Sequence, residues 1–207
     1  VKPKNKEARF LLAQLYVRQS QFKKAEEEYR AIQEIDPKDF NSLTALGRLY
    51  TANKKFNQAI TMYESALKLA PNHAPTYMSL IYLYNQTNQF TQALEMCDKL
   101  ASQIPSDTPP DEPNLAQFVN YIHRFLYFNQ GRAYLGKGDY MNAIKSLKQL
   151  VDVNPEEAVA HYRLGLAYTG IKNYRQALVE YKQALELNPT FIIAQLKLAS
   201  AYIALGE

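Results

Sequence analysis

The sequence has few of the residues and patterns that mark common functional classes. Its 207 residues include one cysteine, Cys97, which excludes an intramolecular disulfide framework and a cysteine-rich metal cluster. No run of about 18 apolar residues is present, so we expect no membrane-spanning helix and no signal-peptide core. Only seven glycines occur, and none belongs to a GxGxxG motif or a phosphate-binding loop. We therefore expect no membrane insertion by this segment and no nucleotide cofactor.

Charge is close to balance. The sequence has 24 basic and 20 acidic residues, a net charge of +4, and the two signs are interleaved along the chain. This excess is too small to indicate a nucleic-acid partner. Apolar residues make up 47% of the chain and charged residues 21%, which is too apolar for a disordered chain and is typical of a folded one.

Residues that could support catalysis or metal binding are not grouped by their spacing. No pair among His73, His123 and His161 has the i, i+4 spacing of a metal site on a helix. Acidic runs such as Glu26–Glu28 place neighbouring carboxylates on different sides of a helix. Cys97 stands where other parts of the chain carry a packing tyrosine, so we expect it to be buried. We expect no enzymatic activity, no cofactor and no metal.

The sequence does contain a pattern that repeats at a fixed period of about 34 residues. Six tyrosines follow one another at this period, with one longer interval between the third and the fourth: Tyr16, Tyr50, Tyr84, Tyr134, Tyr168 and Tyr202. Alanines and prolines keep the same register: Ala25, Ala59, Ala93, Ala143 and Ala177, and Pro37, Pro71, Pro105, Pro155 and Pro189. A fixed period of this length predicts stacked helical hairpins, an architecture that usually holds other proteins.

Residues 40–73 show the pattern of one hairpin. Four residues share one face of a first helix at i, i+3, i+4 and i+7: Leu43, Leu46, Gly47 and Tyr50. After a polar turn, a second amphipathic helix is indicated by Phe56, Ala59, Tyr63 and Ala66. Pro71 ends this helix, because the residue before a proline is disfavoured in the helical conformation. The small residues Gly47 and Ala59 should let the two helices pack closely.

This pattern resembles the tetratricopeptide repeat family, in which Leu-Gly and Tyr mark the first helix and Ala, an aromatic residue, Ala and Pro mark the second. Residues 158–191 repeat it with Leu164-Gly165, Tyr168, Ala177, Tyr181, Ala184 and Pro189. The resemblance covers almost the whole chain. It implies an all-α, right-handed superhelical solenoid of antiparallel helical hairpins, as a single array over residues 1–207. The implied full repeats are 6–39, 40–73, 74–107, 124–157 and 158–191, followed by a half repeat at 192–207.

The period is interrupted once by an insertion, which we place at 108–123. Its start carries the prolines of a loop and then an acidic helix start with proline in the first turn: Pro105, Pro109, Pro110 and Asp111-Glu112-Pro113. Apolar residues continue at helical spacing: Leu115, Phe118, Ile122, Phe125 and Phe128. We expect one helix from about Pro113 to Gly136, ~36 Å long, that lengthens the first helix of the fourth repeat. The added part either packs against its neighbours, as apolar stripes usually do, or forms a ridge that binds a partner or a second copy.

The resemblance also implies where a partner would bind. In tetratricopeptide repeat proteins whose ligands are known, first helices line an inner, concave face. The corresponding candidate residues here are Arg48, Tyr82, Asn85, Gln86, Asn129, Arg132, Tyr162, Arg163 and Lys197, with Phe10, Gln14, Arg18, Thr44, Met78 and Phe128 beside them. Arginines suit carboxylates, amides pair with a peptide backbone, and tyrosine rings add contact area. The alternative interpretation is that these residues are the solvated sides of amphipathic helices.

One subclass of the family binds the acidic C-terminal tails of heat-shock chaperones through a clamp of lysines, asparagines and an arginine. Counted from the first hairpin, the clamp positions hold Phe10, Gln14, Ala45, Pro75 and Ser79, and no other starting hairpin supplies the full set. We therefore do not expect a chaperone-tail adaptor of that type.

The sequence thus favours a non-catalytic protein–protein interaction scaffold that binds a peptide or a partner segment in its concave groove. One alternative is a self-assembling structural protein, joined through the apolar end Ile192–Leu205 or through the long helix. Another is a regulatory module excised from a larger enzyme or cell-envelope assembly. Other proteins or peptides are the expected partners. The sequence does not determine the location; it favours the cytoplasm, with an envelope-associated parent protein as the alternative.

Overall fold

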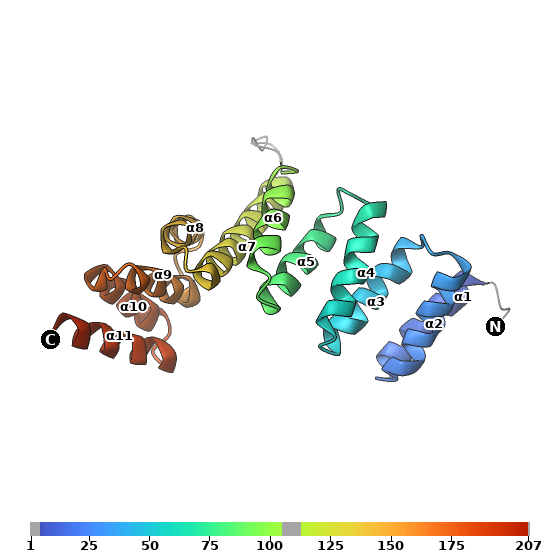
Figure 1. The fold of residues 1–207 in the computed structure, drawn as a ribbon, viewed down its shortest axis with the longest axis horizontal. Helices are drawn as coiled ribbons and strands as arrows, with labels where there is room; N and C mark the ends of the chain where they lie inside the picture. Colours follow the sequence, from blue (N-terminus) through green and yellow to red (C-terminus); the bar gives the residue numbers. More distant parts are fainter. Residues whose placement is uncertain (1–4, 105–112, 207) are drawn as a thin grey trace. The chain divides into compact units, whose positions relative to one another are not determined.

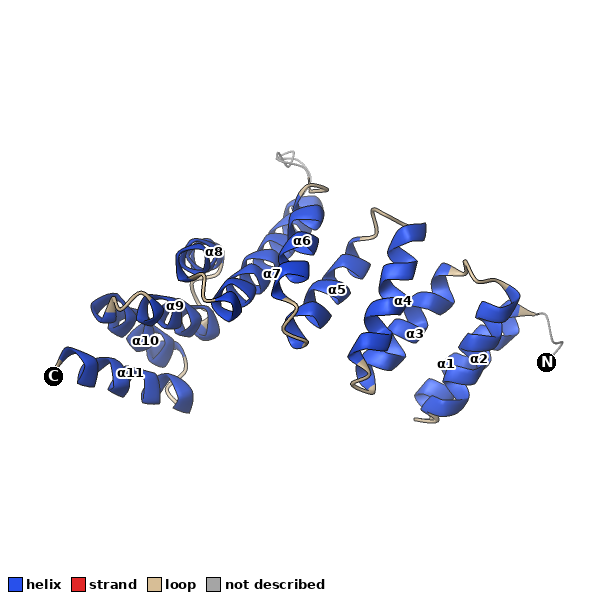
Figure 2. Ribbon diagram, in the orientation of Figure 1, coloured by secondary structure: helices blue, strands red, loops and turns tan. Residues whose placement is uncertain are grey.

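The computed structural model describes residues 5–104 and 113–206. Every regular element in these two ranges is an α-helix (Figure 2). The helices before residue 88 are α1 (Lys6–Arg18), α2 (Phe22–Ile35), α3 (Phe40–Ala52), α4 (Phe56–Leu69) and α5 (Ala74–Gln86). Those after it are α6 (Phe90–Ala101), α7 (Pro113–Lys137), α8 (Tyr140–Val153), α9 (Ala158–Gly170), α10 (Tyr174–Leu187) and α11 (Ile192–Leu205). The all-α fold of helical hairpins predicted from the sequence is confirmed.

The chain divides into two compact units, residues 1–87 and 88–207. In the first unit, each helix from α1 to α4 packs against the next one along the chain (Figure 1). In the second unit, α6 to α11 do the same, and α9 also contacts α7 and α11. Contacts between sequence neighbours are typical of repeat proteins, in which the core lies between successive helices.

Small residues allow the two helices of a hairpin to approach closely. A Cβ atom added at Gly47 would lie 2.7 Å from the ring of Tyr63, and one at Gly165 would lie 2.5 Å from the ring of Tyr181. Both tyrosines are buried, so their rings have little space to move aside. Ala59 is also fully buried. The close packing predicted at these positions is confirmed.

The turn after each first helix, from α1 to α9, contains one residue in the left-handed backbone conformation. These residues have φ between 57° and 74° and are Ser20, Lys54, Asn88, Gly138 and Lys172. They recur in the register of the repeat. The amide of Lys54, for example, closes the end of α3 by donating to the carbonyl of Thr51 at 3.0 Å. Glycine adopts this conformation most easily, yet only Gly138 among them is a glycine.

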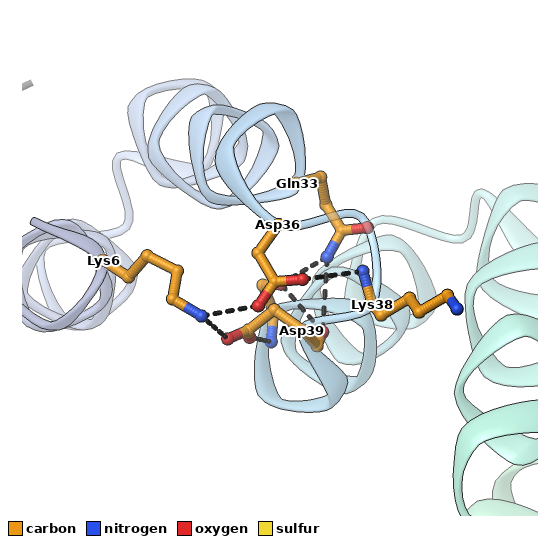
Figure 3. A network of polar contacts seen from close by, with 6 residues as sticks. Lys6, Gln33, Asp36, Lys38 and Asp39 are labelled. Atoms are coloured by element: carbon orange, nitrogen blue, oxygen red, sulfur yellow. Dashed lines mark hydrogen bonds and ion pairs between the residues drawn. The ribbon is translucent and has the colours of Figure 1, made fainter. Parts of the chain in front are cut away.

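A polar network ties the start of α1 to the turn between α2 and α3 (Figure 3). Lys6 Nζ lies 2.6 Å from Asp36 Oδ2 and 3.3 Å from Asp39 Oδ2. Asp39 also accepts a hydrogen bond from the Ser42 amide at 2.8 Å and so caps α3. Gln33 donates to the Asp39 carbonyl at 3.3 Å and to the Ser42 hydroxyl. These contacts hold α1 and the start of α3 to the same turn.

The predicted long helix is present as α7, which begins at Pro113 and ends at Lys137, one residue beyond the predicted end. The predicted proline loop and acidic helix start, residues 105–112, lie outside the described residues. The added turns of α7 have two different faces. Val119 and Ile122 are buried, whereas Phe118 and Tyr121 are 53% and 56% exposed. The extension therefore both packs against its neighbours and presents aromatic rings to solvent.

The last helix, α11, packs against α10 and α9 through a narrow face. Its buried residues are Ala194 and Ala201. Its larger apolar side chains are mostly exposed: Ile192, Ile193, Leu196 and Ile203. None of the helices in the described ranges is long and apolar enough to cross a membrane.

Candidate peptide-binding surfaces

The candidate residues fall into two groups, one in each unit. Those of the first unit are Arg48 on α3 and Tyr82, Asn85 and Gln86 on α5. Those of the second are Asn129 and Arg132 on α7, Tyr162 and Arg163 on α9, and Lys197 on α11. Each group can be judged by what its side chains contact.

A pocket in the first unit contains Arg48. The pocket has a volume of about 420 Å³ and is lined by Gln14, Val17, Arg18, Phe22, Tyr29, Ala45, Arg48, Leu49 and Ala52. These residues come from α1, α2 and α3. The lining combines two guanidinium groups with apolar side chains, and none of the described residues that form it carries a carboxylate. A ligand with an apolar part and a negative group would match both features.

Arg48 also lies close enough to two buried tyrosines to affect their titration. Burial raises the pKa of Tyr29 and of Tyr63, and the positive charge of Arg48 opposes this rise. Both hydroxyls therefore stay protonated near neutral pH. Tyr29 was not among the predicted site residues, because it belongs to a second helix and the resemblance points to first helices alone. Its position in the repeat, shared with Tyr63 and Tyr181, was the available signal.

The candidate residues on α5 differ in how far their side chains are buried. Tyr82 is 42% exposed and Gln86 is partly exposed, so both can meet a partner. Asn85 is completely buried. In the second unit, Asn129 is also buried, and its amide donates to the Phe125 carbonyl at 2.8 Å. The two asparagines therefore serve packing in this structure, and peptide contact by either one stays a prediction.

Arg163 lies in the most unusual electrostatic setting of the candidates. Its guanidinium carbon lies 4.0 Å from the centre of the Phe128 ring. Its Nη1 atom is buried, and no group in the described part of the chain accepts a hydrogen bond from it. Burial and, to a smaller extent, the positive charge of Arg132 lower the pKa of Arg163 to about 10, and the carboxylate of Glu157 opposes this shift. Arg163 thus carries a poorly solvated positive charge beside a second arginine.

Aromatic rings lie beside this arginine pair. The ring centre of Tyr162 is 5.0 Å from that of Phe191 and 6.1 Å from that of Tyr181. Burial raises the pKa of the Tyr162 hydroxyl, which keeps it neutral. Arg163 contacts the Phe128 ring and interacts electrostatically with Arg132 and Tyr162, so these four residues form one cluster, which we call the arginine cluster. Lys197 is exposed on α11, and none of the contacts that define this cluster in the described residues involves it.

Residues of the types that bind metals or take part in catalysis have structural roles here. No group of three or more histidine, cysteine or acidic residues in the described ranges could hold a metal ion. Cys97 is completely buried, and burial raises the pKa of its thiol to about 12. His161 contacts the Glu180 carboxylate at 2.8 Å and the Pro155 carbonyl at 3.0 Å. The side chains of Cys97 and His161 are both buried, so neither can reach a substrate in this structure.

The stacked hairpins define a helical-repeat interaction module. Family models identify the repeat: tetratricopeptide repeat models match residues 50–110, 131–170 and 158–191, which together cover more than half of the chain. The chain belongs to the tetratricopeptide repeat family. A model of anaphase-promoting complex, cyclosome, subunit 3 also matches residues 1–66.

Solved structures share the fold at low sequence identity. The crystal structure of MamA protein is 20% identical, with 89% of this chain and 92% of that chain covered and a TM-score of 0.75. YrrB, described as a TPR protein with an unusual peptide-binding site, is 18% identical over 94% and 92%, with a TM-score of 0.75. A tetratricopeptide repeat protein from Parabacteroides merdae ATCC 43184 is 19% identical over 97% and 73%, with a TM-score of 0.78. No curated protein matches the chain.

Proposed function

We propose that the protein is a non-catalytic scaffold that binds a peptide or partner segment against the first helices of its hairpins. Tetratricopeptide repeats are generally non-catalytic interaction modules with protein or peptide partners. The observation that carries the proposal is the arginine cluster. The buried Nη1 of Arg163 has no acceptor among the described residues, and the neighbouring Arg132 adds a like charge.

This arrangement is costly without a ligand. A buried donor that lacks an acceptor costs about 1–3 kcal/mol, and a second positive charge nearby adds to that cost. Folding alone would favour an apolar side chain at this position. A carboxylate on a partner would both accept the hydrogen bond and neutralise the charge. The pocket around Arg18 and Arg48 in the first unit offers the same combination of guanidinium and apolar groups.

The proposal is tested with the double variant Arg132→Glu plus Arg163→Glu. We expect loss of the partners that the unchanged protein retains in a pull-down read by mass spectrometry, because carboxylates of the partner would then meet carboxylates. Circular dichroism should show unchanged helicity. The control is Lys145→Glu plus Arg175→Glu, which makes the same change in net charge at exposed positions of α8 and α10. If every partner still binds the first double variant, the assignment of this surface is wrong.

A second candidate function, self-assembly, is favoured by the exposed side chains of α11. Ile192, Leu196 and Ile203 are 67%, 63% and 77% exposed and lie on one side of the helix, since they are spaced four and seven residues apart. Burial of such a face against a second copy would remove apolar area from water. Size-exclusion chromatography with light scattering measures the molar mass of the protein in solution. A monomer at all protein concentrations would contradict self-assembly.

A further inference from the structure

One face of α7 carries a row of aromatic side chains beside its buried face, and the last of them, Phe128, also packs against the buried core of the second unit. The row consists of Phe118, Tyr121, Phe125 and Phe128, spaced three, four and three residues apart, and we call it the aromatic track. At 100° per residue these four positions lie within about 80° of one another. Phe118 and Tyr121 are more than half exposed, and Phe125 and Phe128 are partly exposed. The track begins in the segment that interrupts the repeat.

The buried face of α7 lies to one side of this track. Val119, Ile122 and Leu126 are buried, and their positions on the helix are about 80° to 140° away from the centre of the track. The aromatic rings of Phe118 and Tyr121 are therefore not needed to hold α7 in place. Large exposed aromatic groups in a row are unusual on a surface that has no partner.

The track ends at the arginine cluster. Arg132 follows Phe128 after four residues and continues the same row, while Arg163 from α9 lies over the Phe128 ring. The surface is therefore apolar along most of its length and positively charged at one end. A complementary partner needs apolar side chains in a row and a carboxylate beyond the last of them.

The spacing of the row favours a helix as the backbone conformation of that partner. From Phe118 to Arg132 the row rises about 21 Å, in steps of about 4.5 and 6 Å. An α-helix presents side chains in the same steps, whereas side chains on one face of an extended strand recur about every 6.6 Å and lose register with the row. Ridges of one helix pack into grooves of another when their spacings agree. A partner helix of about 14 residues would cover the row.

We propose that the aromatic track and the arginine pair of α7 and α9 dock an acidic amphipathic helix of a partner protein. Its apolar residues, spaced three and four apart, pack along Phe118, Tyr121 and Phe125, and its carboxylate pairs with Arg132 and Arg163. The inference rests on the proposed function, because it uses the same arginines. It adds that the partner is helical and that Phe118 and Tyr121, which lie in the described part of the insertion, form part of the site.

The probe is a fluorescein-labelled helical peptide of about 18 residues, with leucines spaced three and four apart and two glutamates at one end. A second peptide carries the glutamates at the other end, which covers both directions of docking. In a third, the same residues are reordered so that the leucines no longer share a face. A fourth replaces the glutamates by lysines. Fluorescence anisotropy measures binding of each peptide to the unchanged 207-residue chain.

The test variant is Phe118→Ser plus Tyr121→Ser. Because both rings are exposed, the variant should keep the melting temperature of the unchanged protein. We expect it to bind the matching glutamate peptide at least about ten-fold more weakly. The control is Met141→Ser plus Val179→Ser, which removes side chains that are 67% and 56% exposed on α8 and α10. Its affinity should not change.

The outcomes separate this inference from the proposed function. Tight binding of one glutamate peptide, lost both in the Phe118/Tyr121 variant and in Arg132→Glu plus Arg163→Glu, supports helix docking. If the reordered or the lysine peptide binds as tightly, if no peptide binds, or if only the arginine variant loses binding, helix docking along the track is wrong. In the last case the arginines still bind an acidic peptide, so the proposed function stands. A further measurement uses the 207-residue protein itself labelled with fluorescein and mixed with unlabelled protein. If the two bind each other through the same residues, the track is a self-association surface and its assignment to another protein is wrong.

Discussion

Single residues show how far helical periodicity can locate a site. The period places Arg163, Asn85 and Asn129 on first helices. It indicates on which side of the helix each side chain lies, but it does not indicate how deeply the side chain is buried. Asn85 and Asn129 lie on the buried side, whereas Arg163 is placed where its charge is poorly solvated. Depth depends on which neighbouring helix covers each position, and this follows only from the packed structure.

At Arg163 we predict that stability and binding change in opposite directions. The variant Arg163→Met should raise the free energy of unfolding by about 1–2 kcal/mol, because it removes a buried donor that lacks an acceptor and a like charge beside Arg132. The substitution removes the contact of the guanidinium with Phe128, which is worth about 0.5–2 kcal/mol. Apolar packing of the methionine side chain on the same ring replaces this contact. Urea unfolding measures the change. A loss of stability of more than about 1 kcal/mol would show that Arg163 is mainly structural.

The elements of the chain were more predictable than its single residues. The helices of residues 40–73 and the long helix from Pro113 follow from hydrophobic spacing, because each must bury one face against a neighbour. The left-handed turn residues were not predicted. Glycine is the usual signal for this conformation, and Ser20, Lys54, Asn88 and Lys172 do not supply it. Their regular position in the repeat becomes visible once the helix ends are known.

These turns give a prediction at the level of the element. Lys172 has a φ of 60° and an exposed side chain. A left-handed conformation costs a residue with a Cβ atom roughly 1–2 kcal/mol, whereas glycine adopts it readily. We expect Lys172→Gly to raise the free energy of unfolding by about 0.5–1 kcal/mol, after the greater chain entropy of glycine is subtracted.

Thermal unfolding compared with Lys172→Ala measures this effect. Alanine removes the same charge and keeps the Cβ atom, so it should leave the melting temperature nearly unchanged. Equal stabilisation by alanine and glycine would show that charge, and not backbone strain, is the cause.

At the scale of the whole molecule, the family and the all-α repeat fold follow from one periodic pattern, because a period of about 34 residues accommodates two helices and two turns. The division into two compact units did not follow from it, since the period is uninterrupted across Thr87 and Asn88. Whether all repeats form one continuous array stays a prediction. The binding surfaces were predicted as residue types on first helices. Their grouping into the pocket of Arg48 and the cluster of Arg163 required the packed structure.

Acid should act on the two units differently, because particular carboxylates stabilise the first one. Burial raises the pKa of Glu26, but hydrogen bonds from Tyr50 and Arg30 and the charge of Lys55 outweigh it, so the pKa lies below the ordinary 4.5. The hydrogen bond from Lys6 likewise holds the pKa of Asp36 below its ordinary 3.8. A carboxyl group with a lowered pKa stabilises the fold above its ordinary pKa, and this contribution is lost as the pH falls through the lower value in the folded state.

We therefore expect amide hydrogens of α1 to α3 to lose protection from exchange as the pH is lowered from about 5 to 3, after correction for the intrinsic exchange rate. In Glu26→Gln, the stability of these helices should be lower near neutral pH and should depend less on pH over the same range, because one of the titrating groups is absent. Asp152→Gln on α8 makes the same change in charge at an exposed position of the second unit and serves as the control. A pH dependence of α1 to α3 that is the same in Glu26→Gln as in the unchanged protein would contradict the role assigned to the contacts of Glu26 with Tyr50 and Arg30.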